Sequence, residues 1–597
     1  MSKSLGQRLW ADLLWTITRA HEDFFVKYFR LPFMSLPTDT PDVYTRVRVE
    51  KNVAVPMRDG IKLYANIYKP DADGRFPVIL IRLPYGKDEP YCVMPAYGKY
   101  FARKGYVCVV QDVRGKYASQ GKFEPFVNEG ADGYDTLDWI AGQSWCDDNI
   151  GMTGESYYGY TQWAVAWLNH PNLKCIAPGE TFPDTYALGY DRGALCLQTM
   201  GTWAYEMNAR KVNNPLRLDY WHLPLISMDD DAGVRCDYYK DWIRHPSRDA
   251  YWEPINAINV CQKYNQVKIP VYHWCGWYDV LLPGTISSWR GVKENSDSME
   301  ARKNQWLLLP PTDHELTPAE THRIGRIDIG KEAWTYDRLQ RFFDYWLKGA
   351  DNGFDRTPRV EIFTIGDNKW RYEDEWPPVR VRYTRYYFHS GGGANTLHGN
   401  GLLNREEPGD EPTDSYVYDP NDPITISLGH KELWSLAQTM KDRSSVEQRA
   451  DVLVYTAPKL EKDLEITGPI TVTLFAASSA RDTDFTAVLV DVFPDGYTHM
   501  IQEGIVRARY RNSDSEASLI EPGKIYEYTI DLWATSYVVK QGHRIIVEIS
   551  SSNFNRWDRN PNTGHEFGMN AETMKATQTI YHDRQHPSHI TLPVIPR

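Results

Sequence analysis

Ser156 is the first candidate for covalent chemistry in this chain, because it lies in the string GESYYG (154–159) after a short apolar run. A serine hydroxyl is a weak nucleophile at neutral pH, and it attacks a carbonyl only when a base lies within hydrogen-bond reach. A strand that turns sharply into a helix at Gly-x-Ser lifts the hydroxyl above a sheet, and small flanking residues tolerate the strained turn. The string therefore favours a nucleophilic serine, although its second glycine follows Ser156 by three positions. A plain loop is the alternative.

The segments around Ser156 alternate between helix and strand patterns. Helical spacing is found near 96–104, at 133–142 and after Ser156, and the apolar runs typical of strands lie at 77–82, 106–111, 150–153, 267–274 and 306–309. Between about 185 and 266 the strand pattern stops, and helix-like spacing of Trp, Tyr and charged residues predicts a helical insertion. This order predicts an α/β unit in which Ser156 lies where a strand becomes a helix.

The two ends of the chain have different patterns. Leu5, Leu9, Leu13 and Ile17 recur at helical spacing with charged residues between them, so we expect an amphipathic N-terminal helix that packs on the rest of the protein. Beyond about Pro358, runs of β-forming residues are split by turn residues. That texture predicts an all-β sandwich.

Seven strings together resemble one family. They are DVRG (112–115), GKFEPF (121–126), DGYDT (132–136), WCD (145–147), GMTGESY (151–157), DTDF (482–485) and EGIVRARYR (503–511). The chain after about residue 46 resembles the serine hydrolases that include bacterial cocaine esterase, X-prolyl dipeptidyl peptidases and α-amino acid ester hydrolases, the CocE/NonD-type hydrolases. The nucleophile turn of that family has the same wide glycine spacing.

The resemblance implies an α/β-hydrolase domain with an inserted helical cap and a C-terminal all-β jelly-roll domain. This partition agrees with the patterns described above. The expected divisions are an N-terminal helical extension at 1–45, the α/β-hydrolase domain at 46–184 and 267–353, the helical cap at 185–266, and the jelly-roll β-sandwich at 354–597.

The same resemblance assigns the other two triad members. Its acid corresponds to Asp279 in the string GWYD (276–279), and its histidine corresponds to His314 after the apolar run at 306–309. The resulting order Ser, Asp, His is that of α/β-hydrolases. The alternatives are that Asp279 caps a helix, or that the neighbouring Asp313 is the carboxylate.

An acyl-transfer site also needs donors for the developing oxyanion. The backbone N–H of Tyr157, next to the nucleophile, is one candidate. By resemblance the other is the hydroxyl of Tyr85, which follows an apolar run in the string RLPY (82–85). The alternative for Tyr85 is a tyrosine packed at a strand end.

These residues predict a serine hydrolase that cleaves a carboxylic ester through an acyl-enzyme. Amide cleavage by an amidase, an acylase or an X-prolyl-type peptidase would use the same triad. An acyltransferase and a noncatalytic binding protein on a hydrolase fold are the alternatives of other classes. The C-terminal β unit is expected to have a structural role rather than to bind carbohydrate.

The pocket is expected to be apolar and aromatic, with contributions from Tyr190, Trp203 and Tyr205 of the cap. The resemblance implies that α-amino acid ester hydrolases bind the substrate ammonium with an acidic cluster, part of which comes directly after the triad Asp in the sequence. Here Val280, Leu281 and Leu282 follow Asp279 instead. This departure argues against an α-amino substrate. Asp184 and Glu180 are the remaining acidic candidates near the pocket.

The charge and the residue composition of the chain limit the classes of partner that it can bind. The formal net charge of −12 and the interspersed charges argue against nucleic acid as a partner. The sequence has no run of about 18 apolar residues, so we expect no membrane span. It also shows no secretory signal, and a cytoplasmic location is therefore expected. The 8 cysteines lack CxxC pairs and are expected to be reduced, mostly buried thiols. A small-molecule ester or amide is the expected partner, and a homo-oligomer is left open.

No cofactor is expected for this chemistry. His582, His586 and His589 have a spacing that suggests metal ligands, but Pro587 and the lack of clustered carboxylates argue against a metal site. We therefore predict a hydrolase that acts with side chains alone.

Overall fold

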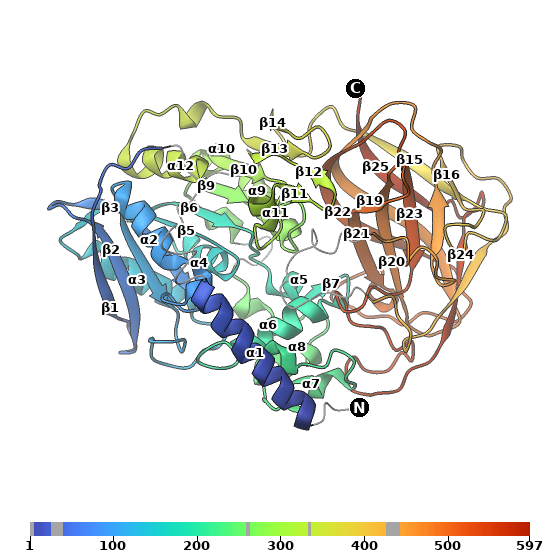
Figure 1. Cartoon of the computed structure of the whole chain (residues 1–597), viewed down its shortest axis with the longest axis horizontal. Coiled ribbons are helices and arrows are strands. Elements are labelled where there is room, and N and C mark those ends of the chain that lie inside the picture. The colour runs from blue at the N-terminus through green and yellow to red at the C-terminus, as the bar shows by residue number, and fades with distance from the viewer. Residues whose placement is uncertain (1–4, 26–39, 258–262, 332–335, 426–441) are drawn as a thin grey trace.

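The computed structural model describes residues 5–25, 40–257, 263–331, 336–425 and 442–597. Figure 1 shows a part with a sheet covered by helices, and beside it a part built from strands that contains the C-terminus. Helices of the predicted cap lie below the sheet in this view. Cys261 lies outside the described residues, and the seven described cysteines are free thiols.

The first sheet is mixed and has its parallel strands in the middle. Its order is β1 (Val47–Pro56), β2 (Lys62–Pro70), β4 (Val107–Asp112), β3 (Phe76–Leu83), β5 (Cys146–Glu155), β6 (Leu173–Gly179), β9 (Val271–Trp274), β10 (Gln305–Leu309), β13 (Val360–Thr364) and β14 (Lys369–Glu373). The neighbours from β4 to β13 pair in parallel, whereas β1, β2 and β14 pair antiparallel. Every residue of β4 is buried, as expected for a strand covered on both faces.

Helices connect the parallel strands. They include α2 (Met94–Arg103), α3 (Glu129–Ala141), α4 (Tyr157–Ala166), α9 (Leu282–Asn295), α10 (Met299–Lys303) and α12 (Asp337–Lys348). In α4, which follows Ser156, all ten residues are buried. Because crossover helices cover a parallel sheet, the carboxyl ends of its strands meet at one edge, where ligands bind in open α/β folds. The α/β prediction is confirmed.

The predicted cap lies between β6 and β9 and is mostly helical. It contains α5 (Thr185–Gly189), the short strands β7 (Tyr190–Asp191) and β8 (Ala194–Leu195), α6 (Thr202–Met207), α7 (Met228–Asp231) and α8 (Asp237–Arg244). Figure 1 shows α5, α6 and α8 close to the C-terminal part as well as to the sheet. The cap is therefore in a position to contribute side chains to the sheet edge.

The C-terminal part is all-β, as predicted. Its strands are β15 (Arg382–His389), β16 (Leu402–Asn404), β17 (Asp414–Tyr418), β18 (Leu453–Thr456), β19 (Leu464–Ser478), β20 (Asp484–Val492), β21 (Thr498–Arg507), β22 (Tyr526–Val539), β23 (Arg544–Ser550), β24 (Ala576–Tyr581) and β25 (His589–Ile595). The preceding β13 pairs with β10 of the first sheet. The first sheet therefore gains strands after residue 353, and the boundary at 353/354 stays a prediction.

The N-terminal helix α1 (Leu5–Phe25) lies across the cap (Figure 1), and polar side chains of the helix pair with cap residues. The carboxylate of Asp12 accepts hydrogen bonds from Arg217, and Arg8 lies 3.6 Å from Asp231. The side chains of Leu9 and Trp10 are about 60% exposed, at 61% and 60%. Ion pairs, rather than an apolar stripe, thus orient this helix. Among the described residues, no helix combines the length and the apolar character needed to cross a bilayer.

Candidate active site

Ser156 lies at a sharp turn between β5 and α4. Its backbone has φ 59° and ψ −126°, a conformation that a residue with a side chain seldom adopts. The N–H of Ser156 donates to the carbonyl oxygens of Gly179 and Glu180 at 3.1 and 2.9 Å. The turn is thus held from the end of the adjacent strand β6, in the geometry of a nucleophile elbow.

The two glycines of the string each face a side chain at close range. A Cβ on Gly154 would lie 2.6 Å from the Cβ of Tyr158, and a Cβ on Gly159 would lie 2.5 Å from the Cβ of Thr181. Thr181 also donates its hydroxyl to the carbonyl of Ser156 at 2.7 Å. The contact with Thr181 explains why the second glycine stands three positions after the serine.

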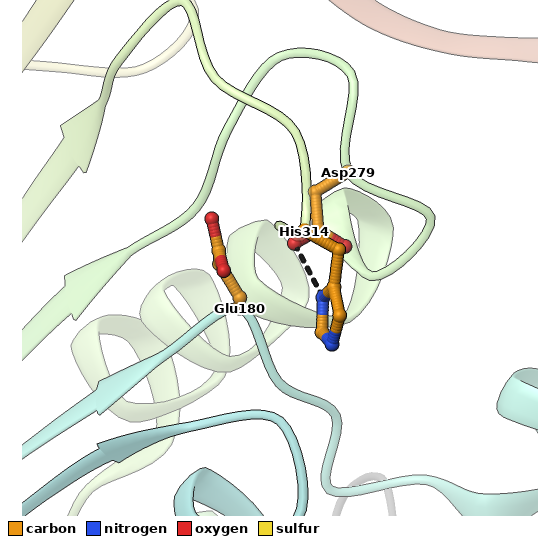
Figure 2. Close-up of side chains that lie close together, drawn as sticks. All are labelled: Glu180, Asp279 and His314. Carbon is orange, nitrogen blue, oxygen red and sulfur yellow. Dashed lines mark hydrogen bonds and ion pairs between the residues drawn. The ribbon is translucent and has the colours of Figure 1, made fainter. Parts of the chain in front are cut away.

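Asp279 and His314 form a direct pair. The Nδ1 of His314 lies 2.8 Å from the Oδ2 of Asp279, as drawn in Figure 2. The other oxygen of Asp279 accepts the N–H of Leu281 at 2.6 Å, and the carboxylate is fully buried. A carboxylate that accepts from Nδ1 fixes the tautomer in which Nε2 can act as the base. The structure brings these two predicted residues together.

The charge of His314 depends on its neighbours. Burial disfavours the imidazolium, but the charge of Asp279 and its hydrogen bond, together with the charges of Glu315 and Glu155, raise the pKa of His314 to about 9. The carboxyl of Glu155, next to Ser156 in the sequence, has a pKa raised to about 7, mainly by burial. Below about pH 9 the histidine is therefore largely protonated, and only its neutral form can accept a proton.

Tyr85 follows β3 and reaches Ser156. Its hydroxyl hydrogen-bonds with the side chain of Ser156 and accepts the indole N–H of Trp203 at 2.9 Å. Burial raises the pKa of Tyr85, whereas both hydrogen bonds lower it. Tyr157, in turn, is the first residue of α4, where a helix leaves backbone N–H groups without intrahelical partners. The hydroxyl of Tyr157 donates to Glu129 at 2.9 Å.

An aromatic wall extends from Tyr157, next to Ser156, into the cap. The ring of Trp203 lies 5.7 Å from that of Tyr157, 5.5 Å from that of Phe126 and 6.3 Å from that of Trp242, all in stacked orientation. Sequence reasoning named Trp203 only as a lining residue and missed Phe126 and Trp242. No local pattern distinguishes these rings from ordinary core aromatics.

The other cap and acidic candidates have different surroundings. The hydroxyl of Tyr190 donates to the carbonyl of Trp242, and Tyr205 is buried. Asp184 accepts the N–H groups of Tyr186 and Ala187 at the start of α5 and pairs with Arg248 at 2.6 Å. Asp184 therefore acts as a helix cap.

Glu180 lies next to the pair formed by Asp279 and His314. One atom from each of the three side chains lies within 4.8 Å of the others, and they form the one group of potential metal ligands among the described residues. The Nδ1 of His314 is already engaged with Asp279, so this arrangement primarily serves hydrogen bonding. A surface pocket of about 460 Å³ is lined by Phe126 and Tyr160, but by none of the predicted site residues.

Comparison with known proteins shows to which family the chain is related. The family model for X-Pro dipeptidyl-peptidase (S15 family) matches residues 59–315, and that for the X-Pro dipeptidyl-peptidase C-terminal non-catalytic domain matches residues 352–591. Cocaine esterase of Rhodococcus sp. is 37% identical over 581 residues, which cover 92% of this chain and 99% of that protein. A putative serine esterase of Mycobacterium bovis is 28% identical, over 91% of this chain and 94% of its own length.

Solved structures agree with this relationship. An α-amino acid ester hydrolase superposes with a TM-score of 0.79 at 26% identity and covers 94% of this chain and 98% of its own. An aminopeptidase from a Thaumarchaeota archaeon superposes with a TM-score of 0.80 at 26% identity, over 94% of this chain and 99% of its own. The chain is a serine hydrolase that acts on ester or amide bonds, and it belongs to the family of cocaine esterase and the X-Pro dipeptidyl-peptidases.

Proposed function

We propose that the protein hydrolyses a carboxylic ester of a small molecule through an acyl-enzyme on Ser156. The observation that carries this proposal is the 2.8 Å hydrogen bond between Asp279 and His314, at the sheet edge where Ser156 turns from β5 into α4. An alcohol leaving group needs less protonation than an amine, and this favours esters over amides as substrates.

In the proposed reaction, the Oγ of Ser156 attacks the substrate carbonyl while His314 takes the hydroxyl proton. The tetrahedral intermediate collapses, its bond to the alkoxy group breaks, and His314 gives the proton to the departing alcohol. Water then attacks the acyl carbon and passes a proton to His314, which returns it to Oγ as the acid leaves. Asp279 stabilises the imidazolium throughout.

The negative charge of the intermediate needs donors that are already in position. We assign this role to the hydroxyl of Tyr85 and the backbone N–H of Tyr157. Because Trp203 donates to Tyr85, it occupies an acceptor position of the phenol oxygen and leaves the phenol proton available for the oxyanion. A preorganised donor of this kind contributes about 10²–10³ in rate.

The acyl group that fits this site is apolar or aromatic. The stacked rings of Tyr157 and Trp203 lie beside the nucleophile and offer a flat, rigid surface. A cytoplasmic location is also part of the proposal, and the seven free cysteines among the described residues support it. The oligomeric state is not assigned.

Hydrolysis of p-nitrophenyl esters from acetate to octanoate, by wild type and Ser156→Ala, tests the proposal. We expect turnover by the wild type, none above background by the variant, and a fluorophosphonate adduct on Ser156 by mass spectrometry. A benzoate ester compared with the acetate reports on the aromatic wall. Turnover that persists in Ser156→Ala, or folded wild type that neither turns over nor is labelled, contradicts the proposal.

A further inference from the structure

Glu180 occupies a place in the fold equivalent to those of the proposed triad. Ser156 follows β5, Glu180 follows β6, Asp279 follows β9 and His314 follows β10. These four strands are consecutive neighbours in the sheet and run parallel. Their carboxyl ends therefore deliver four functional side chains to one stretch of the sheet edge.

The side chain of Glu180 lies beside the hydrogen bond between Asp279 and His314. Figure 2 shows the carboxyl of Glu180 on the side of the imidazole that carries the bonded nitrogen. Atoms of the three side chains lie within 4.8 Å of one another. Since a hydrogen bond spans about 2.8 Å, a shift of about 2 Å brings the carboxyl of Glu180 to the histidine.

The carboxyl of Glu180 makes no hydrogen bond among the described residues. It is fully buried, and neither of its oxygens has a hydrogen-bond partner among the described residues. Its backbone, in contrast, is engaged, because the N–H donates to Trp274 and the carbonyl accepts from Ser156. Burying a carboxyl group without a hydrogen-bond partner costs free energy. Packing alone therefore does not explain the presence of Glu180 at this position.

Two buried carboxyls this close oppose each other's ionisation. Burial first, and then the charge of Asp279, raise the pKa of Glu180 well above its usual range, and the carboxyls of Glu155, Asp313 and Glu315 add to the shift. As long as Asp279 carries its charge, the neutral form of Glu180 is therefore favoured. If the charge at Asp279 were lost, the largest charge opposing ionisation of Glu180 would be lost with it.

We propose that Glu180 is a second positioning carboxyl for His314, which shares a single negative charge with Asp279 and can orient the histidine in its place. This inference rests on the proposed function, because it assigns Glu180 to the same acyl-transfer site. It makes the site a four-member array in which either of two carboxyls, delivered by neighbouring strands, holds the base.

A double-mutant cycle on the full chain tests the proposal. Asp279→Ala opens room for the carboxyl of Glu180, and we expect kcat/KM to fall by only about 10²-fold, whereas loss of the acid in a triad with no substitute costs about 10⁴-fold. Asp279→Ala with Glu180→Gln should show that full loss. Equal activity of the single and double variants would overturn the proposal.

The pH dependence separates this role from a structural one. The residual activity of Asp279→Ala should rise with pH as Glu180 ionises, and this limb should be absent in the double variant. Glu180→Gln alone replaces one neutral group by another, so its pH profile should match that of the wild type within about 0.3 unit. A shift of that profile to lower pH would mean that Glu180 is ionised in the wild type, which contradicts the shared charge.

Glu315→Gln in the Asp279→Ala background is the matched control, since Glu315 also lies near His314. We expect it to keep the residual activity within about 3-fold at the plateau pH. If Asp279→Ala does not fold, the same cycle is run with Asp279→Gly, which also removes the carboxylate and opens room for Glu180. A failure of the ester-hydrolase proposal is recognised separately, because wild type would then show neither turnover nor labelling of Ser156.

Discussion

The indole N–H of Trp203 donates a hydrogen bond to the hydroxyl of Tyr85 at 2.9 Å. The two residues are 118 positions apart in the sequence, one in the cap and the other after β3. The same phenol hydrogen-bonds with Ser156. The cap therefore orients the side chain that we assign to the oxyanion hole.

Trp203→Phe removes this donor and keeps an aromatic ring. We expect kcat to fall about 5-fold with little change in KM, because one neutral hydrogen bond contributes about 1 kcal/mol and acts here through Tyr85. Steady-state kinetics on p-nitrophenyl acetate measure the effect. Tyr85→Phe, which deletes the proposed oxyanion donor itself, should cost about 10²–10³ in kcat. A larger loss in Trp203→Phe than in Tyr85→Phe would contradict this order.

The pH profile should report the charge on His314. Because the pKa of His314 is raised to about 9 and only the neutral imidazole accepts the proton of Ser156, kcat/KM should rise with pH up to about that value. Glu155→Gln removes one of the charges that raise this pKa. We expect its rising limb to lie up to about 1 unit lower. Glu124→Gln, an exposed carboxylate paired with Lys122, is the control that should not move the limb.

The elbow should not tolerate a larger residue at Gly159. A methyl group there would lie 2.5 Å from the Cβ of Thr181, so Gly159→Ala must displace Ser156 or β6. We expect a loss of about 1–3 kcal/mol in stability and at least about a 10²-fold loss of kcat. Gly142→Ala is the control, because the nearest atom to a Cβ there is 3.5 Å away. Normal activity of Gly159→Ala would show that the contact is easily relieved.

A buried ion network in the C-terminal part connects it to the cap. Arg507 donates to Asp484 at 2.9 and 2.8 Å and to Asp558 at 3.0 Å, and Asp558 accepts the N–H of Leu195 in the cap at 2.8 Å. Arg507→Met leaves two buried carboxylates without a positive partner, so we expect a loss of about 3–5 kcal/mol in stability. Urea unfolding monitored by circular dichroism measures this loss of stability. Arg382→Met, in an exposed part of β15, should change stability by less than about 0.5 kcal/mol.

Local patterns in the sequence were sufficient for the α/β order, the all-β C-terminal part and the position of Ser156. The reason is that strand and helix periodicities, and the small residues that a strained turn needs, are properties of consecutive residues. The strings shared with a known family identified Asp279, His314 and Tyr85 as candidates. The structure brings Asp279 to His314 and Tyr85 to Ser156.

Other features were decided only by tertiary structure. The sequence predicted an amphipathic α1 but not that Asp12 and Arg217 would turn its apolar side outward. It offered Glu180 only as an acidic candidate near the pocket, and it could not show that the carboxyl is buried beside Asp279 and His314. Burial, and the charge that a buried group can carry, depend on residues that the fold brings together from distant positions. For that reason no local pattern could reveal the contact between Trp203 and Tyr85 or the shared charge of two neighbouring carboxyls.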